Sequence, residues 1–399
     1  MNQYEASFRH AGPDRLAGML RDARHYTLAL FDTLAEAGYA DAARLPRLPI
    51  INPPLWELGH TAWFAEWFVL RNASSSRPGD ADGHSLLARG DDWFDSSLVP
   101  HRTRWALDLP APGAIRTYCE EVLERILARL DTEPDEDAAL YPYRLALAHE
   151  DMHGEALLYT MQTLGVPLQS GMAGALPAPP PSGEIAFAGG AFVRGGEQSY
   201  GFVFDNEKQA ASCRVAPFAI DAALVSNASY LAFVEDGGYR DLRHWSEAGH
   251  AWLAASGREA PRYWRRAEGG GWEQLLFGRR AMLVPEAPVR HLSLHEAQAY
   301  CRWAGRRLPL EDEWECAAVS GHPGFRWGGL WEWTASPFLP YAGFAPDRYL
   351  EYSAPWFGTR QTLRGASFAT PARFRSPHFR NFFTPERDDI FAGFRTCAL

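Results

Sequence analysis

The stretch that decides both fold and chemistry reads Leu145-Ala-Leu-Ala-His149-Glu150-Asp151-Met152-His153-Gly-Glu155-Ala-Leu-Leu. Its apolar spacing is typical of a helix, and helical residues four apart lie on one face, one above the other. His149 and His153 can therefore reach one metal ion. Glu150 completes the pattern H-E-x-x-H. The stretch therefore predicts a helix that carries a metal site. Other parts of the chain must indicate which chemistry that site performs.

Three further segments before residue 165 have helical apolar spacing, and together with the histidine helix they make four. Asn52-Pro-Pro-Leu looks like a capped helix start with proline just inside. Four helices of this length predict an antiparallel bundle over residues 1–165, and such bundles often build metal sites from inward side chains. The expected helices cover about 14–37, 52–70, 113–130 and 141–164.

The pattern of apolar and polar residues changes after a segment rich in proline and glycine, which we expect to be a linker over 166–184. Short alternating segments follow, such as 191–194 and 216–220, separated by Gly, Pro, Asn and Asp. Only two short helices stand out, at 227–234 and 293–303, the second with a capping box of Ser293 and Glu296. We expect loops and short strands elsewhere, and therefore an α+β domain over 185–399.

Composition excludes several classes of protein. The 399 residues have a net charge of -10 and show no basic face, which speaks against nucleic-acid binding. There is no apolar run of about eighteen residues and no signal peptide, so we expect a cytoplasmic protein without a membrane span. The five cysteines are scattered without a C-x-x-C pair, which indicates reduced thiols. The sequence gives no indication of oligomeric state.

Three interpretations of the paired histidines are open. They could be structural core histidines with hydrogen-bond partners. They could be zinc-protease ligands with Glu150 as general base, although Tyr159 occupies the place of the third histidine in the extended motif. They could form a three-histidine, non-haem iron site with His60 of the second helix, beside which Gly59 permits close approach. The last interpretation is favoured, because a facial set of nitrogens leaves open positions for O2 and substrate.

His291 and His295 are a control for this reasoning. They are also four apart, but the expected helix starts between them, so they do not share a face and we expect no metal there.

The sequence around His60, His149 and His153 resembles the nonheme-iron sulfoxide synthases of ergothioneine biosynthesis, and the resemblance covers nearly the whole chain. That family joins a DinB-like bundle to a domain like the formylglycine-generating enzyme, with a C-type-lectin-like core. Formylglycine-generating enzymes use a late cysteine pair, whereas here only Cys397 follows Arg364, so we do not expect that activity. In the second half the resemblance rests on the segments 189–195, 204–207, 227–231, 235–239, 307–315, 331–336, 363–367 and 391–395.

The resemblance implies a set of functional residues. His60, His149 and His153 would bind Fe(II), with O2 as co-substrate and hercynine, the betaine of histidine, as substrate. Tyr349, in Tyr-x-x-Tyr, would supply a proton to bound oxygen. Tyr352 and Asn381 would contact the substrate; either tyrosine could instead be a hydrogen bonder at the domain interface.

The family divides by chalcogen donor. Arg104 lies in a loop that departs from the usual arginine clamp for a cysteine-type donor. Met152 stands where glutamine is common, and Phe383 where some members carry an acid near the donor. The chain thus looks most like the selenoneine synthase branch, which joins the imidazole C2 of hercynine to a 1-selenosugar. The alternative is a sulfoxide synthase that uses cysteine or γ-glutamylcysteine, and a different class would be a sugar-binding module on an inert bundle.

Overall fold

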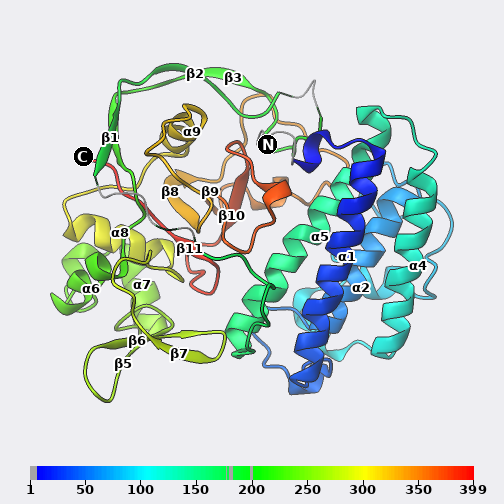
Figure 1. The fold of residues 1–399 in the computed structure, drawn as a ribbon, viewed down its shortest axis with the longest axis horizontal. Coiled ribbons are helices and arrows are strands. Elements are labelled where there is room, and N and C mark those ends of the chain that lie inside the picture. Colours follow the sequence, from blue (N-terminus) through cyan, green and yellow to red (C-terminus); the bar gives the residue numbers. More distant parts are fainter. Residues whose placement is uncertain (1–6, 177, 179–182, 198–200) are drawn as a thin grey trace.

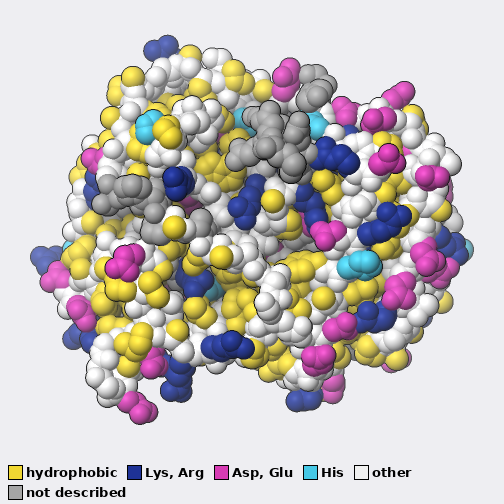
Figure 2. Space-filling model, viewed as in Figure 1, with side chains coloured by type: hydrophobic (Ala, Val, Ile, Leu, Met, Phe, Trp, Pro, Cys, Tyr) yellow, Lys and Arg dark blue, Asp and Glu magenta, His cyan; other side chains and the backbone are white. Residues whose placement is uncertain are grey.

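The computed structural model describes residues 7–176, 178, 183–197 and 201–399. Two parts lie side by side in Figure 1: a bundle of long helices, and a part that mixes short helices with strands. The expected linker falls between them, and residues 177 and 179–182 of it are outside the described residues. Acidic and basic side chains are interspersed over the face drawn in Figure 2. No described helix is long and apolar enough to cross a membrane.

The first part is the expected four-helix bundle. Helix α1 packs on α4 and α5, and α2 packs on the same two helices. The bundle interior is apolar, with Leu20, Trp56, Ile126 and Leu147 among its buried side chains. The bundle helices are α1 (Pro13–Glu36), α2 (Pro54–Ala65), α4 (Pro112–Leu130) and α5 (Asp137–Leu164), with a short α3 (Gly90–Phe94) between α2 and α4.

Two helix bounds differ from expectation. Helix α5 begins a turn earlier, at Asp137, whose carboxylate suits a helix N-terminus and pairs with Arg144 at 2.6 Å. The second helix is α-helical only to Ala65 and continues as a π-helical turn over Glu66–Leu70. Turns of this kind often occur at functional sites.

The second part is α+β, as expected, but the expectation of only two helices there is wrong. Helix α7 is capped by Ser246, and α9 forms within an acidic segment that periodicity did not single out. The helices are α6 (Asn227–Glu235), α7 (Glu247–Ser256), α8 (Leu294–Trp303) and α9 (Glu311–Val319). The capping box of Ser293 and Glu296 is present at the start of α8.

The strands form small sheets around one four-stranded sheet of order β10-β9-β8-β11. The other pairs are β1 with β4 and β2 with β3, and β5, β6 and β7 form a three-stranded sheet. The strands are β1 (Glu184–Phe187), β2 (Gly190–Arg194), β3 (Ala211–Val215), β4 (Phe218–Asp221), β5 (Trp264–Arg266), β6 (Trp272–Leu276), β7 (Arg279–Met282), β8 (Trp331–Pro337), β9 (Gln361–Gly365), β10 (Arg380–Phe383) and β11 (Ala392–Gly393).

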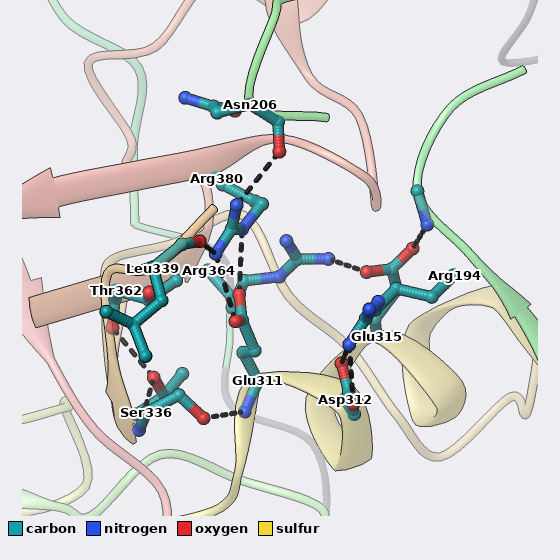
Figure 3. Close-up of polar contacts among 12 residues, drawn as sticks. Arg194, Asn206, Glu311, Asp312, Glu315, Ser336, Leu339, Thr362, Arg364 and Arg380 are labelled. Atoms are coloured by element: carbon teal, nitrogen blue, oxygen red, sulfur yellow. Dashed lines mark hydrogen bonds and ion pairs between the residues drawn. The ribbon is translucent and has the colours of Figure 1, made fainter. Parts of the chain in front are cut away.

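Buried ion pairs connect sequence motifs of this part that are far apart in the chain. Figure 3 shows Arg380 of β10 bound to Glu311 of α9, at 2.9 and 3.0 Å, and Arg364 of β9 bound to Glu315 at 2.5 Å. Each partner neutralises a charge that would be costly to bury alone. The acids of one motif thus fix the arginines of another, and with them the strand that carries Asn381.

Helix α5 is one of the elements that join the two parts. Glu155, two residues beyond His153, accepts hydrogen bonds from Trp331 Nε1 (2.7 Å), Ser367 Oγ (2.6 Å) and Thr370 Oγ1 (2.7 Å). The helix that carries two of the three histidines is therefore anchored in the second part of the molecule.

Candidate metal centre and its surroundings

The structure brings His60, His149 and His153 together. One ring nitrogen of each lies within 4.8 Å of one ring nitrogen of the others. His60 comes from the middle of α2, and the other two lie one turn apart on α5. The ring centroids of His149 and His153 are 4.4 Å apart, and each is 5.0 Å from that of His60. Three imidazoles thus converge between two helices that are far apart in the sequence.

Hydrogen bonds fix two of the rings with one nitrogen left free. His60 Nδ1 is 2.7 Å from the carbonyl oxygen of Phe94, and His153 Nδ1 is 2.8 Å from Glu57 Oε1. A carbonyl and a carboxylate only accept, so each Nδ1 carries a proton, and the Nε2 atoms take no part in these two hydrogen bonds. His149 Nδ1 is buried without a hydrogen-bond partner among the described residues. This is the arrangement that metal-ligating histidines use.

Gly59 makes the contact between His60 and Phe94 possible. A Cβ atom at Gly59 would lie 2.2 Å from the Phe94 ring, so the expectation of close approach at this glycine is confirmed, with Phe94 at the end of α3 as the neighbour. The missing side chain lets Phe94 lie against α2, and its carbonyl then reaches His60.

The electrostatics keep two of the histidines neutral. Burial, with His153 nearby, lowers the pKa of His60 and that of His149 well below the usual 6.5. Neutral imidazole is the form that binds metals. Of the charged groups nearby, Glu57 is 1% exposed and directed at His153.

Glu150 points away from the three histidines. Its carboxylate lies 3.0 Å from Arg24 Nε and accepts a second contact from Arg24 Nη2 at 3.1 Å. One residue is about 100° around a helix, so Glu150 faces α1 when its neighbour His149 faces α2. The carboxylate is therefore not placed to act as the general base of a zinc protease. His291 precedes α8, as expected, and no group of three possible metal ligands forms there among the described residues.

Arg104 lies in a layered stack above His60. Its guanidinium is 3.7 Å from the centre of the Trp56 ring, and Trp56 stacks on His60 at 4.7 Å. Nη1 donates to Asn52 Oδ1 at 2.8 Å, and Nη2 donates to the carbonyl of Val99 at 3.3 Å. Burial lowers the pKa of Arg104 to about 10. The arginine is thus brought to the edge of the histidine cluster.

Tyr349 and Tyr352 approach the cluster from the second part. The Tyr349 ring is 6.0 Å from that of His149 and 5.0 Å from Phe64, which itself stacks on His149 at 3.6 Å. Burial raises the pKa of Tyr349, with Glu351 adding to the effect. Tyr352 lies 5.8 Å from Tyr349 and directs its hydroxyl to Met152 Sδ at 3.9 Å. Tyr349 is therefore placed beside the histidines, and Tyr352 contacts Tyr349 and Met152, the residue before His153.

Two expected substrate residues lie further away. Asn381 is on β10, where its Oδ1 accepts from the N–H of Phe382, the neighbour that contacts Tyr352 at 5.8 Å. Phe383 packs on Tyr159 at 6.3 Å. Tyr159 is six residues beyond His153, about 9 Å along α5. Among the contacts of described residues, neither Asn381 nor Phe383 touches the histidines.

Sequence reasoning missed Glu57, Phe64 and Phe94. Glu57 carried a usable signal, because it precedes His60 by three residues and so shares its helix face. Phe64 lies four residues beyond His60 and could have been found in the same way. Phe94 contributes a backbone carbonyl from a five-residue helix, for which the sequence has no periodic pattern.

Both halves of the chain match known families. Residues 19–161 match the DinB superfamily, and residues 170–329 and 326–398 match the Sulfatase-modifying factor enzyme 1-like domain. The fold class expected from the sequence is thereby confirmed. A formylglycine-generating enzyme of Thermomonospora curvata is 37% identical over 54% of this chain and 93% of its own length.

Other relatives span both domains. A hercynine oxygenase of Mycolicibacterium thermoresistibile is 34% identical over 95% of this chain and 94% of its own length. A hercynine oxygenase of Mycolicibacterium smegmatis is 31% identical over 96% of this chain and 98% of its own length. The chain therefore belongs to the hercynine oxygenase family, the ergothioneine-type family in which a DinB domain precedes a Sulfatase-modifying factor enzyme 1-like domain.

Proposed function

We propose that this protein is an iron- and O2-dependent oxidoreductase that joins the imidazole C2 of hercynine to a chalcogen donor, and that the donor is a 1-selenosugar. The observation that carries the proposal is the convergence of His60, His149 and His153 beside Tyr349. Family membership supports hercynine as the substrate, since the full-length relatives are hercynine oxygenases. Core packing alone gives no reason for the ring nitrogens of three histidines to meet in one place.

The residues present fit an iron ion. Phe94 and Glu57 bind the Nδ1 atoms of two imidazoles, whose Nε2 atoms can then face a metal, and the third imidazole has a buried nitrogen without a hydrogen-bond partner among the described residues. Held by the three histidines, Fe(II) would supply the activation of O2 and leave positions open for substrates. Histidine sites also accept zinc, so the metal is identified by reconstitution.

The surrounding side chains would orient the substrates and donate a proton. The phenol of Tyr349 is a weak acid within the site and would donate its proton during oxidation. Aromatic faces suit the trimethylammonium group of hercynine, which cannot donate ordinary hydrogen bonds. Tyr352, Met152 and Asn381 would bind the substrate.

The assignment of a sugar as chalcogen donor rests on the lack, among the described residues, of a pair of free arginines that could bind the carboxylates of a cysteine-type donor. A cysteine-type donor carries carboxylates that call for paired arginines. Here Arg102 is exposed, whereas Arg104 is half-buried on Trp56 with two of its nitrogens already bound to Asn52 and Val99. Phe383 is apolar and packs on Tyr159. These features favour an uncharged sugar donor.

A second candidate keeps the same chemistry with cysteine or γ-glutamylcysteine as donor. It is favoured by Arg104, whose hydrogen bonds go to an amide and a carbonyl, so that its charge has no carboxylate partner in those contacts. A carboxylate of the donor could neutralise it.

One experiment separates these functions. The purified protein is loaded anaerobically with Fe(II), mixed with hercynine and each donor in turn, exposed to O2, and analysed by mass spectrometry. A selenium adduct from the selenosugar alone supports the proposal. A sulfoxide from a cysteine-type donor supports the second candidate. No product from any donor would refute both, and tight sugar binding by the metal-free protein would then favour a binding module.

A further inference from the structure

A serine of the helical half holds the segment that carries Tyr349. The N–H of Ser76 donates to the carbonyl of Arg348 at 2.8 Å, and Ser76 Oγ accepts from the N–H of Leu350 at 3.0 Å. The same hydroxyl donates to the carboxylate of Glu351. Ser76 thus binds both neighbours of Tyr349 across the boundary between the two domains: its backbone holds Arg348, and its side chain holds Leu350 and Glu351.

The Tyr349 segment has little regular structure of its own. It lies between β8, which ends at Pro337, and β9, which begins at Gln361. The described residues between these strands form only a short 3-10 turn, Ala354–Trp356. Contacts made by other parts of the chain therefore decide where this backbone lies.

The loop that carries Ser76 is itself fixed to the helix after His60. Trp67 Nε1 donates to the carbonyl of Ser75 at 2.9 Å. Further along the loop, the Arg71 side chain donates to the carbonyls of Asp82 and Gly83, each at 3.1 Å. The place of Ser76 is therefore set by the same stretch of chain that places His60.

The serine also lies beside the tyrosine ring. Ser76, Glu351 and Tyr349 line one narrow crevice, whose other wall is formed by aromatic side chains of α2 and the π-helical turn, Phe64 among them. Phe64 stacks on His149 and contacts the Tyr349 ring. A shift of the segment from 348 to 351 would therefore change the distance from the phenol to the histidines.

We propose that Ser76 is a positioning residue for Tyr349, through which the domain that supplies the histidines holds the tyrosine of the other domain beside them. The inference rests on the proposed function of Tyr349 as proton donor. Its physical basis is the sensitivity of such steps to placement, since a displacement of about 1 Å can lower a rate by as much as about a hundredfold.

The test compares Ser76→Ala, Ser76→Thr and Ser74→Ala with the wild type. Ser76→Ala removes the acceptor of the Leu350 N–H, and Ser76→Thr keeps a hydroxyl in its place. Ser74→Ala is the matched control, because Ser74 is exposed and its hydroxyl makes one long contact, to Asp80 at 3.4 Å, among the described residues. Tyr349→Phe is measured alongside, to report on the tyrosine itself.

The first readout needs no metal. Amide hydrogen exchange of residues 348–352 is followed by mass spectrometry in the metal-free protein. Loss of one hydrogen bond, worth about 1 kcal/mol, should speed exchange there roughly fivefold in Ser76→Ala. Ser76→Thr should restore protection, and Ser74→Ala should match the wild type.

The second readout is turnover of the iron-loaded protein. Ser76→Ala should bind iron as the wild type does and lose roughly tenfold in kcat, with KM for hercynine changed less than about twofold. Wild-type kcat in Ser76→Ala beside a slow Tyr349→Phe would overturn this inference and leave the proposed function intact. Wild-type kcat in Tyr349→Phe would overturn the proton-donor role and the inference together.

Discussion

Glu57 Oε1 lies 2.8 Å from Nδ1 of His153, although 96 residues separate the two in the chain. The carboxylate is 1% exposed and belongs to α2, the helix that also carries His60. It holds the His153 ring so that Nε2 faces the other imidazoles. Helix α2 thus supplies one histidine of the centre and orients another on α5, which makes the geometry of the centre depend on the pairing of these two helices.

Removing the charge of Glu57 should weaken metal binding. In Glu57→Gln the acceptor for His153 Nδ1–H becomes a neutral amide that can also turn its NH2 group toward the ring. Losing such an orienting partner typically lowers metal affinity about 10- to 100-fold. The Kd for Fe(II), measured anaerobically by titration, should rise by that factor. The control is Glu120→Gln on the exposed face of α4, and equal affinity of the two variants would contradict this role.

Removing a histidine of the centre should abolish iron binding altogether. His153→Ala leaves two imidazoles and an unpaired buried Glu57 carboxylate, so both the metal and product formation should be lost. Bound iron is counted by atomic spectroscopy after anaerobic loading and gel filtration. His25→Ala, at an exposed position of α1, should load like the wild type. Equimolar iron and full activity in His153→Ala would rule out the proposed centre.

A methyl group at Gly59 should disturb the centre without touching a histidine. A Cβ atom there would lie 2.2 Å from the Phe94 ring, so in Gly59→Ala the ring and the carbonyl behind His60 must move. We expect weaker Fe(II) binding and a loss of stability of about 1–3 kcal/mol, as for other overpacked cores.

Gly18→Ala is the matched control for this change. Gly18 is also inside a bundle helix, but no atom of the described residues lies within 4 Å of its Cβ position. Alanine there should stabilise the helix by up to about 1 kcal/mol and leave iron binding unchanged. Urea unfolding of both variants gives the comparison, and unchanged metal affinity in Gly59→Ala would show that Phe94 does not fix His60.

Glu296 should make stability depend on pH. Its carboxyl accepts from Tyr239 (2.5 Å) and from the N–H and Oγ of Ser293 (2.8 and 2.9 Å), yet burial, with Asp388 nearby, raises its pKa from 4.5 to about 7. The folded protein then holds this proton more tightly than the unfolded chain. The resulting stability is fully present below pH 4.5 and lost as the pH rises through about 7.

The size of this effect has an upper bound. The difference between a pKa of 4.5 and one of about 7 corresponds to roughly 3–4 kcal/mol. Glu296→Gln cannot ionise, so its free energy of unfolding should fall less than that of the wild type between about pH 5 and about pH 8. Urea unfolding of both metal-free proteins at the two pH values measures the difference, and parallel pH dependences would exclude a shifted Glu296.

The sequence by itself determined the kind of fold and the shared helix face of two of the three histidines. Two histidines at i and i+4 share a helix face wherever the helix lies, because that spacing follows from local backbone geometry. The three-four spacing of apolar residues likewise located the bundle helices to within about a turn, and the capping box located the start of α8. The motif acids and arginines indicated the second domain before their ion pairs were visible.

Only the tertiary structure decided which groups surround the three histidines. Residue spacing does not tell which helices become neighbours, so the bond from His153 to Glu57 and the turn of Glu150 toward Arg24 could not be read from the chain. The same holds for the carbonyl of Phe94 and the hydroxyl of Ser76, which act from loops and short turns whose course depends on long-range packing. Side-chain types and periods are local properties, whereas the distances that make a site are set by the packing of the whole chain.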